Sequence, residues 1–339
     1  MKFFLKVLKW IGISISSLLV LIIMAGLAFR LFGPQQHPPL GELIDIGGFK
    51  LHINRTGEKN NQPTLVIEGG AGSSSEYYHW LSEGLKNHMR VVRYDRAGIG
   101  YSDASNTSRD PETIARELHT LLEKTGEAPP YILAGHSMGG PYIRVFAQLY
   151  PSEVVGMVFL DATHPEQVER GGAPKKSSFK FKAVIGIYQA LAVLGDLGVI
   201  GLYDRFFGPT LAGKGLPDEI NQRIPDFLLN GKLVRAYTKE IEQYHYALKQ
   251  AGKANQFGTI PIRVFTAVEL NKKAHKAAEK SLNKTIQMQK EYTQLSTNGK
   301  QLLIDGNHNS IFTRKENATI ICKEIIQVLE ELQSKSASR

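Results

Sequence analysis

Short apolar segments alternate with amphipathic ones along most of the chain from Gly41 onward. Runs of Val, Ile and Leu bounded by Gly or Pro indicate buried strands, and apolar residues spaced three and four apart indicate helices. This alternation predicts an α/β protein with a mostly parallel central sheet flanked by helices. The predicted strands are 41–46, 49–55, 64–68, 90–94, 131–134, 154–160, 260–266 and 301–304, and the predicted helices include 111–125, 140–150 and 315–332.

One long segment, 165–258, interrupts the alternation because it contains no strand-like run. Its apolar stretches at 183–202 and 226–250 are instead helix-like. An insertion of this length is too long for a loop within a compact domain, so we interpret it as a helical lid over the carboxyl edge of the sheet. The predicted organisation is then a first core part at 41–164, the lid at 165–258, a second core part at 259–334 and a tail at 335–339.

The N-terminal segment 11–29 contains 19 consecutive uncharged residues. As a helix it would span roughly 28 Å, close to the thickness of a bilayer's hydrocarbon core. The preceding segment 1–10 is basic, and the proline-containing segment 30–40 is expected to be an extended linker. Three lysines before the apolar run and one arginine after it favour a cytoplasmic N-terminus. We therefore expect a single-pass cell-membrane protein that contacts lipid through this helix, with the rest of the chain outside the cytoplasm.

A cleaved signal peptide is the alternative interpretation of this segment. Gly26-Leu27-Ala28 offers small residues of the kind that signal peptidases prefer. The apolar run is, however, longer than the usual 7–15 residues of a signal peptide's hydrophobic region, and this favours an anchor.

Composition and charge narrow the classes of partner. A hydrophobic content of 42% and a charged content of 22% are typical of a globular protein. Of the net charge of +9, four positive charges lie within residues 1–30, so residues 31–339 carry +5 without a dense Lys/Arg stripe. This distribution argues against a nucleic-acid-binding protein. The single cysteine, Cys322, excludes an internal disulfide, and the apolar run around it predicts a buried, unreactive thiol.

The motif Gly135-His136-Ser137-Met138-Gly139 matches G-x-S-x-G and lies between the predicted strand 131–134 and the predicted helix 140–150. In this context the serine stands at the apex of a strained strand-to-helix turn, and the glycines keep neighbouring side chains from colliding. The motif predicts Ser137 as a nucleophile, whereas the alternative is a structural serine in a tight turn. We expect His136 to point away from the nucleophile's side and to pack.

On these residues the chain resembles the α/β-hydrolase superfamily, and in particular its esterase- and lipase-like serine hydrolases, over about residues 41–332. The stretch Asp95-Arg96-Ala97-Gly98-Ile99-Gly100-Tyr101-Ser102 is similar to the family's D-x-x-G-x-G-x-S segment, whose role is structural. The resemblance implies that His308, in the loop before the last helix, is the general base. Imidazole suits that role because its pKa lies near neutrality.

Two backbone amides are expected to stabilise the oxyanion of a tetrahedral intermediate. One is Met138, directly after the nucleophile. The resemblance to the family's H-G-x pattern implies that the other is Gly70, although Glu68 stands where the family usually has histidine. We expect the Glu68 carboxylate to point elsewhere, into hydrogen bonds, because its charge would oppose the oxyanion. The turn Gly69-Gly70-Ala71-Gly72 is also similar to the G-G-x-G turn of proline iminopeptidases.

Two carboxylates are candidates for the acid that orients His308. In most of the family this acid follows the strand that corresponds to 260–266, and Glu269 lies near that point. Some relatives place it one strand earlier, where Asp161 lies 24 residues after Ser137. We favour Asp161, because this spacing resembles that of those relatives and the turn at 267–270 lacks the usual G-x-x-D pattern.

These features predict a serine hydrolase that cleaves a carboxylic ester or thioester of a small molecule, with an apolar part to suit the apolar lid. No metal or organic cofactor is predicted, since no ligands occur at the short regular spacing of a zinc site. One alternative is a proline-iminopeptidase-like aminopeptidase, which would need an acidic anchor such as Glu166, Glu169 or Glu219. The other is a non-catalytic binding protein on a hydrolase scaffold.

Overall fold

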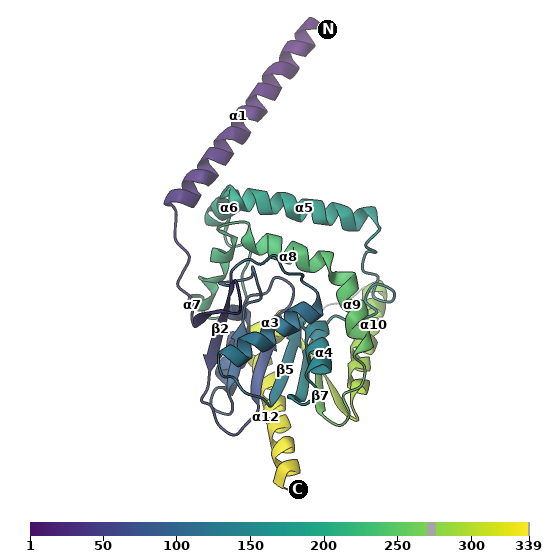
Figure 1. Ribbon diagram of the computed structural model, residues 1–339. Coiled ribbons are helices and arrows are strands. Elements are labelled where there is room, and N and C mark those ends of the chain that lie inside the picture. The colour runs from purple at the N-terminus through teal and green to yellow at the C-terminus, as the bar shows by residue number, and fades with distance from the viewer. Residues whose placement is uncertain (270–275, 338–339) are drawn as a thin grey trace.

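The computed structural model describes residues 1–269 and 276–337, and within them eight strands form a single sheet (Figure 1). The strand order is β1-β2-β4-β3-β5-β6-β7-β8. The strands β1 and β2 form an antiparallel hairpin, β2 is also antiparallel to β4, and the other neighbours pair in parallel. The predicted α/β fold is therefore confirmed. The strands are β1 (Glu42–Asp45), β2 (Lys50–Thr56), β3 (Thr64–Glu68), β4 (Val91–Tyr94), β5 (Tyr131–His136), β6 (Val154–Leu160), β7 (Pro261–Val268) and β8 (Asn298–Asp305).

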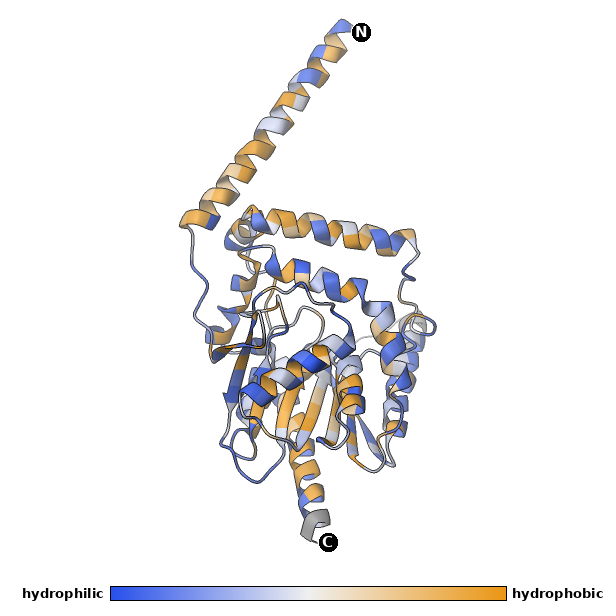
Figure 2. Ribbon diagram, in the orientation of Figure 1, coloured by the Kyte–Doolittle hydropathy of each residue, from blue (hydrophilic) through white to orange (hydrophobic). Residues whose placement is uncertain are grey.

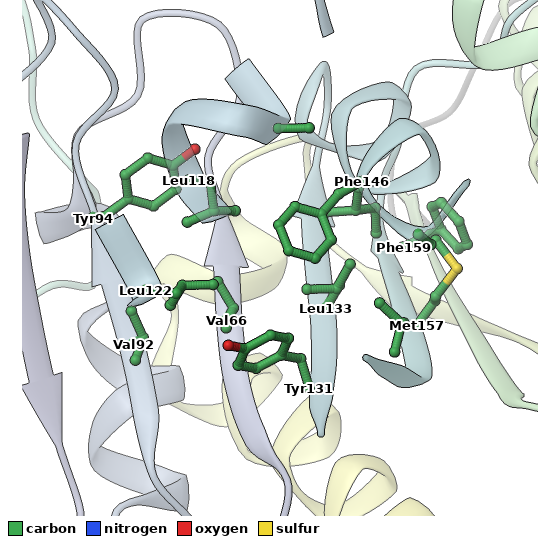
Figure 3. Close-up of a cluster of buried hydrophobic side chains, with 14 of the residues drawn as sticks. Val66, Val92, Tyr94, Leu118, Leu122, Tyr131, Leu133, Phe146, Met157 and Phe159 are labelled. Atoms are coloured by element: carbon green, nitrogen blue, oxygen red, sulfur yellow. The ribbon is translucent and has the colours of Figure 1, made fainter. Parts of the chain in front are cut away.

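Helices cover both faces of the sheet, and the alternation of side chains along each strand supplies both cores. In β3, for example, Val66 packs with α3 and α4 on one face, while Ile67 packs with α2 and α12 on the other. Figure 3 shows the first of these cores, in which Leu118 and Phe146 contact strand residues such as Leu133. The helices of the core are α2 (His79–Leu85), α3 (Pro111–Lys124), α4 (Gly139–Leu149), α10 (Lys276–Lys290), α11 (Ser310–Thr313) and α12 (Lys315–Ala337).

The insertion 165–258 contains no strand and forms a helical cap, as predicted. Its outermost helix, α5, crosses the top of the molecule above α8 (Figure 1). The predicted helix 183–202 is two helices bent by 84°, because Gly198 adopts the left-handed conformation at φ 74° between them. The cap helices are α5 (Phe179–Asp196), α6 (Val199–Phe207), α7 (Asp218–Asn221), α8 (Lys232–Glu242) and α9 (Tyr244–Lys253).

The N-terminal helix α1 (Lys2–Phe32) is, among the described residues, the one helix that by itself is long and apolar enough to cross a membrane. A signal sequence near the N-terminus can also be apolar enough to meet this criterion. The helix includes residues 2–10 of the predicted basic segment and residues 30–32 of the predicted linker. It projects away from the sheet, and its C-terminal end lies against α6 (Figures 1 and 2).

Candidate active site

Ser137 lies in the tight turn between β5 and α4, at the carboxyl edge of the sheet. Its φ of 52° is in the left-handed region that non-glycine residues rarely adopt, as expected for a strained strand-to-helix turn. The second glycine of the motif is sterically required, because a Cβ on Gly139 would lie 2.2 Å from the carbonyl oxygen of Glu68. The local sequence therefore folds into the turn that exposes a serine hydroxyl at this edge.

Asp161 and His308 come together beside this turn, from the ends of β6 and β8. Nδ1 of His308 lies 2.6 Å from Oδ2 of Asp161. The other carboxylate oxygen, Oδ1, accepts hydrogen bonds from the amide of Ala267 at 3.1 Å and from Nε2 of Gln289 at 2.7 Å. Both oxygens of Asp161 are thus held, so the carboxylate fixes the orientation of the imidazole ring.

Glu269, the other candidate acid, lies directly after β7 and is exposed. The Nδ1 atom of His308 that such an acid would contact is already bonded to Asp161. Parallel strands bring their carboxyl ends to one edge of a sheet, and this places the residue after β6 within reach of the loop after β8.

Ser137 and His308 line one cavity, without a direct hydrogen bond between their side chains among the described contacts. Catalytic hydrogen bonds often shorten only in the complex with substrate. The His308 side chain is 48% exposed, so it has room to reorient towards the serine.

His136 is buried and packs against Phe312, as expected, but it lines the cavity beside His308 rather than pointing away from the nucleophile's side. Its ring centroid lies 4.5 Å from that of His308, and its Nε2 lies 3.2 Å from the carbonyl oxygen of His308. A carbonyl only accepts hydrogen bonds, so Nε2 carries the proton and Nδ1 accepts from the hydroxyl of Tyr78 at 3.1 Å. Burial lowers the pKa of His136 well below 6.5 and keeps the ring neutral, which this arrangement requires. His136 therefore links the loop that carries His308 to Tyr78 through hydrogen bonds.

The two amides predicted for an oxyanion hole differ in their surroundings. Met138 follows the serine and lines the cavity, and no described hydrogen bond uses its amide. The amide of Gly70 donates to the hydroxyl of Tyr78 at 3.0 Å, so it is already occupied. The next residue of the same turn, Ala71, also lines the cavity, and its amide takes part in no described hydrogen bond. The glycine-rich turn lies close to Ser137, and its amide without a described hydrogen bond is that of Ala71 rather than that of Gly70.

Glu68 points into hydrogen bonds, as predicted, rather than at the serine. Its carboxylate accepts from the hydroxyl of Tyr94 and from the guanidinium of Arg96. Burial raises the pKa of Glu68, and the neighbouring Arg96 opposes that shift. Arg96 also donates to the carbonyl oxygens of Gly69 and Gly70, so the glutamate and the arginine together support the glycine-rich turn.

The cavity has a volume of about 810 Å³ and extends from Ser137 into the cap. Its wall on the cap side consists mostly of Leu, Ile, Val and Tyr side chains, and none of the described residues that line it is acidic. Such a lining suits an uncharged, apolar ligand. The cap residues of the wall include Tyr188, Leu191, Val199, Ile200, Tyr203, Leu233 and Tyr237.

One cluster of described residues outside this cavity has the geometry to hold a metal ion, namely His164, Glu166 and Glu291. Arg170 donates to the carboxylates of both glutamates, at 2.7 Å to Glu166 and 2.6 Å to Glu291. A cation would have to compete with this guanidinium, so the cluster is better described as an ion-pair network.

Comparison with known proteins supports the fold. The family model of the alpha/beta hydrolase fold matches residues 63–183. The chain is 30% identical to the uncharacterised protein YbdG of Bacillus subtilis over 173 residues, which cover 49% of this chain and 53% of YbdG. It is 29% identical to a proline iminopeptidase of Lactobacillus delbrueckii over 35% of this chain and 42% of that enzyme. It is 27% identical to the human (lyso)-N-acylphosphatidylethanolamine lipase over 50% of this chain and 49% of that lipase.

The chain therefore spans about half of the length of these curated relatives, or less. The likeness to solved structures is more extensive. Wild-type Cfl2 of Burkholderia cenocepacia superposes with a TM-score of 0.62 at 19% identity, and the match covers 87% of this chain and 98% of Cfl2. At this identity the likeness shows the fold alone.

Proposed function

Because this chain is a member of the α/β-hydrolase superfamily, we propose that it is a serine hydrolase that cleaves carboxylic esters or thioesters through an acyl-enzyme on Ser137. The observation that carries the proposal is the 2.6 Å hydrogen bond between His308 and Asp161, at the cavity that also contains Ser137. A nucleophile, a base and an acid that orients the base are the three parts of the serine-hydrolase mechanism.

In the first half-reaction, the Ser137 hydroxyl attacks the carbonyl carbon and His308 Nε2 accepts its proton. Collapse of the tetrahedral intermediate breaks the bond to the alcohol or thiol, which leaves with the proton from His308. Water then attacks the acyl-enzyme with His308 again as base, releasing the carboxylic acid and restoring Ser137. Asp161 would hold Nδ1 protonated, so that Nε2 is free to accept, and would stabilise the imidazolium.

The oxyanion of each intermediate needs donors aimed at it, each typically worth about 3 kcal/mol of barrier. We assign one donor to the amide of Met138. With the Gly70 amide bonded to Tyr78, we assign the other to Ala71, the next amide of the glycine-rich turn.

The lining of the cavity favours an ester over an aminopeptidase substrate. An aminopeptidase binds the ammonium group of its substrate, and a buried cation needs a counter-charge. None of the described residues that line the cavity is acidic, and Glu166, one of the predicted anchors, is paired with Arg170. An apolar acyl group requires no such partner.

The decisive experiment is covalent labelling of the full-length protein in detergent with a fluorophosphonate probe. We expect wild type to be labelled at Ser137 and a folded Ser137→Ala variant to remain unlabelled. A folded wild type that does not react would overturn the proposal in favour of a binding protein. Hydrolysis of p-nitrophenyl esters of graded chain length, measured beside prolyl and other aminoacyl anilides, then separates esterase from aminopeptidase activity.

We also propose that α1 anchors the protein in the cell membrane, with its N-terminus in the cytoplasm. The helix is long and apolar, and Lys2, Lys6 and Lys9 precede its uncharged part. The full-length protein should then sediment with membranes, and its cap and core should be digested by protease added outside the cell. A mature protein recovered in solution, with its N-terminus near Phe29, would instead show a cleaved signal.

A further inference from the structure

The outer face of the cap is apolar and exposed over two helices, α5 and α6. On α5, Ile187 is 59% exposed and Val193 is 56% exposed, and on α6, Phe206 and Phe207 are 75% and 77% exposed. Figure 2 shows apolar residues along most of α5, with hydrophilic ones at its N-terminal end. Contiguous apolar surface of this kind in a folded protein marks a binding face for a partner or a membrane.

The charges at the N-terminal end of this face all have one sign, whereas α6 carries one acid, Asp204, which accepts hydrogen bonds from Thr210, and one arginine, Arg205. Residues 170–195 include Arg170 and four lysines, Lys175, Lys176, Lys180 and Lys182, but no acidic residue. Each of these lysines is exposed. The one acid of α5, Asp196, is paired with Arg235 and Arg30. An apolar helix face flanked by lysines is typical of helices that lie in the interface of an anionic membrane.

The same cap helices contact the end of α1. A Cβ on Gly26 would lie 2.5 Å from the carbonyl oxygen of Leu197, so only glycine permits this approach. Arg30 donates a hydrogen bond to the carbonyl oxygen of Asp196, at the C-terminal end of α5. If α1 crosses a bilayer, these contacts hold the junction of α5 and α6 at the bilayer surface.

We propose that the outer face of α5 and α6 lies in the headgroup layer of the membrane that α1 enters, and that the enzyme takes its ester from that membrane. The second part rests on the proposed hydrolase function. Together α5 and α6 are as apolar as a spanning helix, but their 84° bend suits a pair that lies in the interface rather than one that crosses it.

The inner sides of these helices give the proposal its link to the active site. Tyr188 and Leu191 of α5, and Ile200 of α6, are partly buried and line the cavity that contains Ser137. A single layer of helix therefore separates the proposed lipid surface from the cavity. A membrane-borne amphiphile with an acyl ester would need to cross only this layer to bring its carbonyl to the serine.

The docking itself is tested without any assay of activity. Full-length Ile187→Cys and Phe206→Cys variants carry an environment-sensitive fluorophore and are reconstituted in vesicles of phosphatidylcholine with one third phosphatidylglycerol. The matched control is Ile320→Cys. Ile320 is also an exposed isoleucine, but it lies on α12, which belongs to the hydrolase core and not to the cap. We expect brominated acyl chains to quench the fluorophore at 187 and 206 at least twofold more than at 320. Equal quenching at all three positions would overturn the proposal.

Crosslinking between labelled positions of two copies, without quenching by lipid, would show that this face binds a second copy of the chain. That result would also overturn the proposal. Fluorophosphonate labelling decides the hydrolase function separately, so failure of either proposal can be distinguished.

The supply of substrate is tested with acidic substitutions. Ile187→Glu and Phe206→Glu should lower turnover of a long-chain ester embedded in those vesicles at least tenfold, while turnover of a soluble short-chain ester stays unchanged. Ile320→Glu should affect neither. Equal turnover of the embedded ester by wild type and both cap variants would contradict the proposal that the substrate comes from the membrane. This conclusion would hold even if the quenching experiment placed the cap in the bilayer.

Discussion

Arg96 of the core and Glu240 of cap helix α8 form a buried, two-bond ion pair. Nε of Arg96 lies 2.7 Å from Oε1 of Glu240, and Nη2 lies 3.0 Å from Oε2. The same arginine supports the turn that carries Ala71, and Oε2 of Glu240 accepts from the amide of Gly72 at 3.1 Å. The pair thus connects the cap to the turn assigned to the oxyanion hole.

We predict that Glu240→Gln destabilises the protein and slows ester hydrolysis. Removing one partner of a buried ion pair typically costs about 3 kcal/mol or more when the other charge is left alone, and here we expect a smaller loss because Arg96 keeps its ion pair with Glu68. Thermal unfolding and kcat of the purified variant provide the measurement. The control is Glu242→Gln, on the same helix, which should leave both unchanged. An unaltered melting temperature for Glu240→Gln would contradict the prediction.

The assignment of Asp161 predicts that Asp161→Asn cuts turnover by roughly 10⁴, as in the serine-protease template, because His308 loses control of its tautomer. The matched variant is Glu269→Gln, which should stay within a few-fold of wild type. Turnover of both is compared after circular dichroism has shown that they fold. The assignment is wrong if Glu269→Gln is the variant with the large loss of turnover.

We predict that mild acidification destabilises the folded protein, because His136 is buried in its neutral form. Burial holds its pKa in the folded protein well below 6.5, whereas the unfolded chain protonates near that value. Below about pH 6.5 the unfolded state therefore binds more protons, and stability falls with pH by up to about 1.4 kcal/mol per unit until the folded pKa is reached. His136→Gln should make the melting temperature less sensitive to pH between 7 and 5. The exposed His88, changed to Gln, should leave the pH profile as in wild type.

Cys322 is predicted to be chemically silent in the folded protein. It is buried against α2, and burial raises its pKa to about 12. Reaction requires the thiolate, so an aromatic disulfide reagent at pH 8 should release no thiolate from native protein and one equivalent after denaturation. The exposed thiol of Ile187→Cys is the positive control. Rapid reaction of native wild type would show that this thiol is accessible.

Those features that depend on neighbours in the chain followed from the sequence. The strand 64–68 was predicted with the bounds of β3, and G-x-S-x-G gave the turn of Ser137, because continuous apolar runs and glycine-flanked turns are local signals. The helix 111–125 was predicted within one residue of the bounds of α3 for the same reason. By contrast, α10 was not predicted, since its polar sequence carries little of the apolar periodicity that marks a packed helix.

Contacts between distant segments were decided only by the tertiary structure. Sequence spacing favoured Asp161 but left Glu269 open, and in the structure the packing of β6, β7 and β8 brings Asp161 to His308. His136 was placed on the wrong side, because its partners Tyr78 and His308 come from other parts of the chain. Gln289, which holds Asp161, carries no motif at all. Local propensity acts over a few residues. The hydrogen-bond partners of a side chain depend instead on which strands lie side by side in the sheet, and therefore on which strand ends meet.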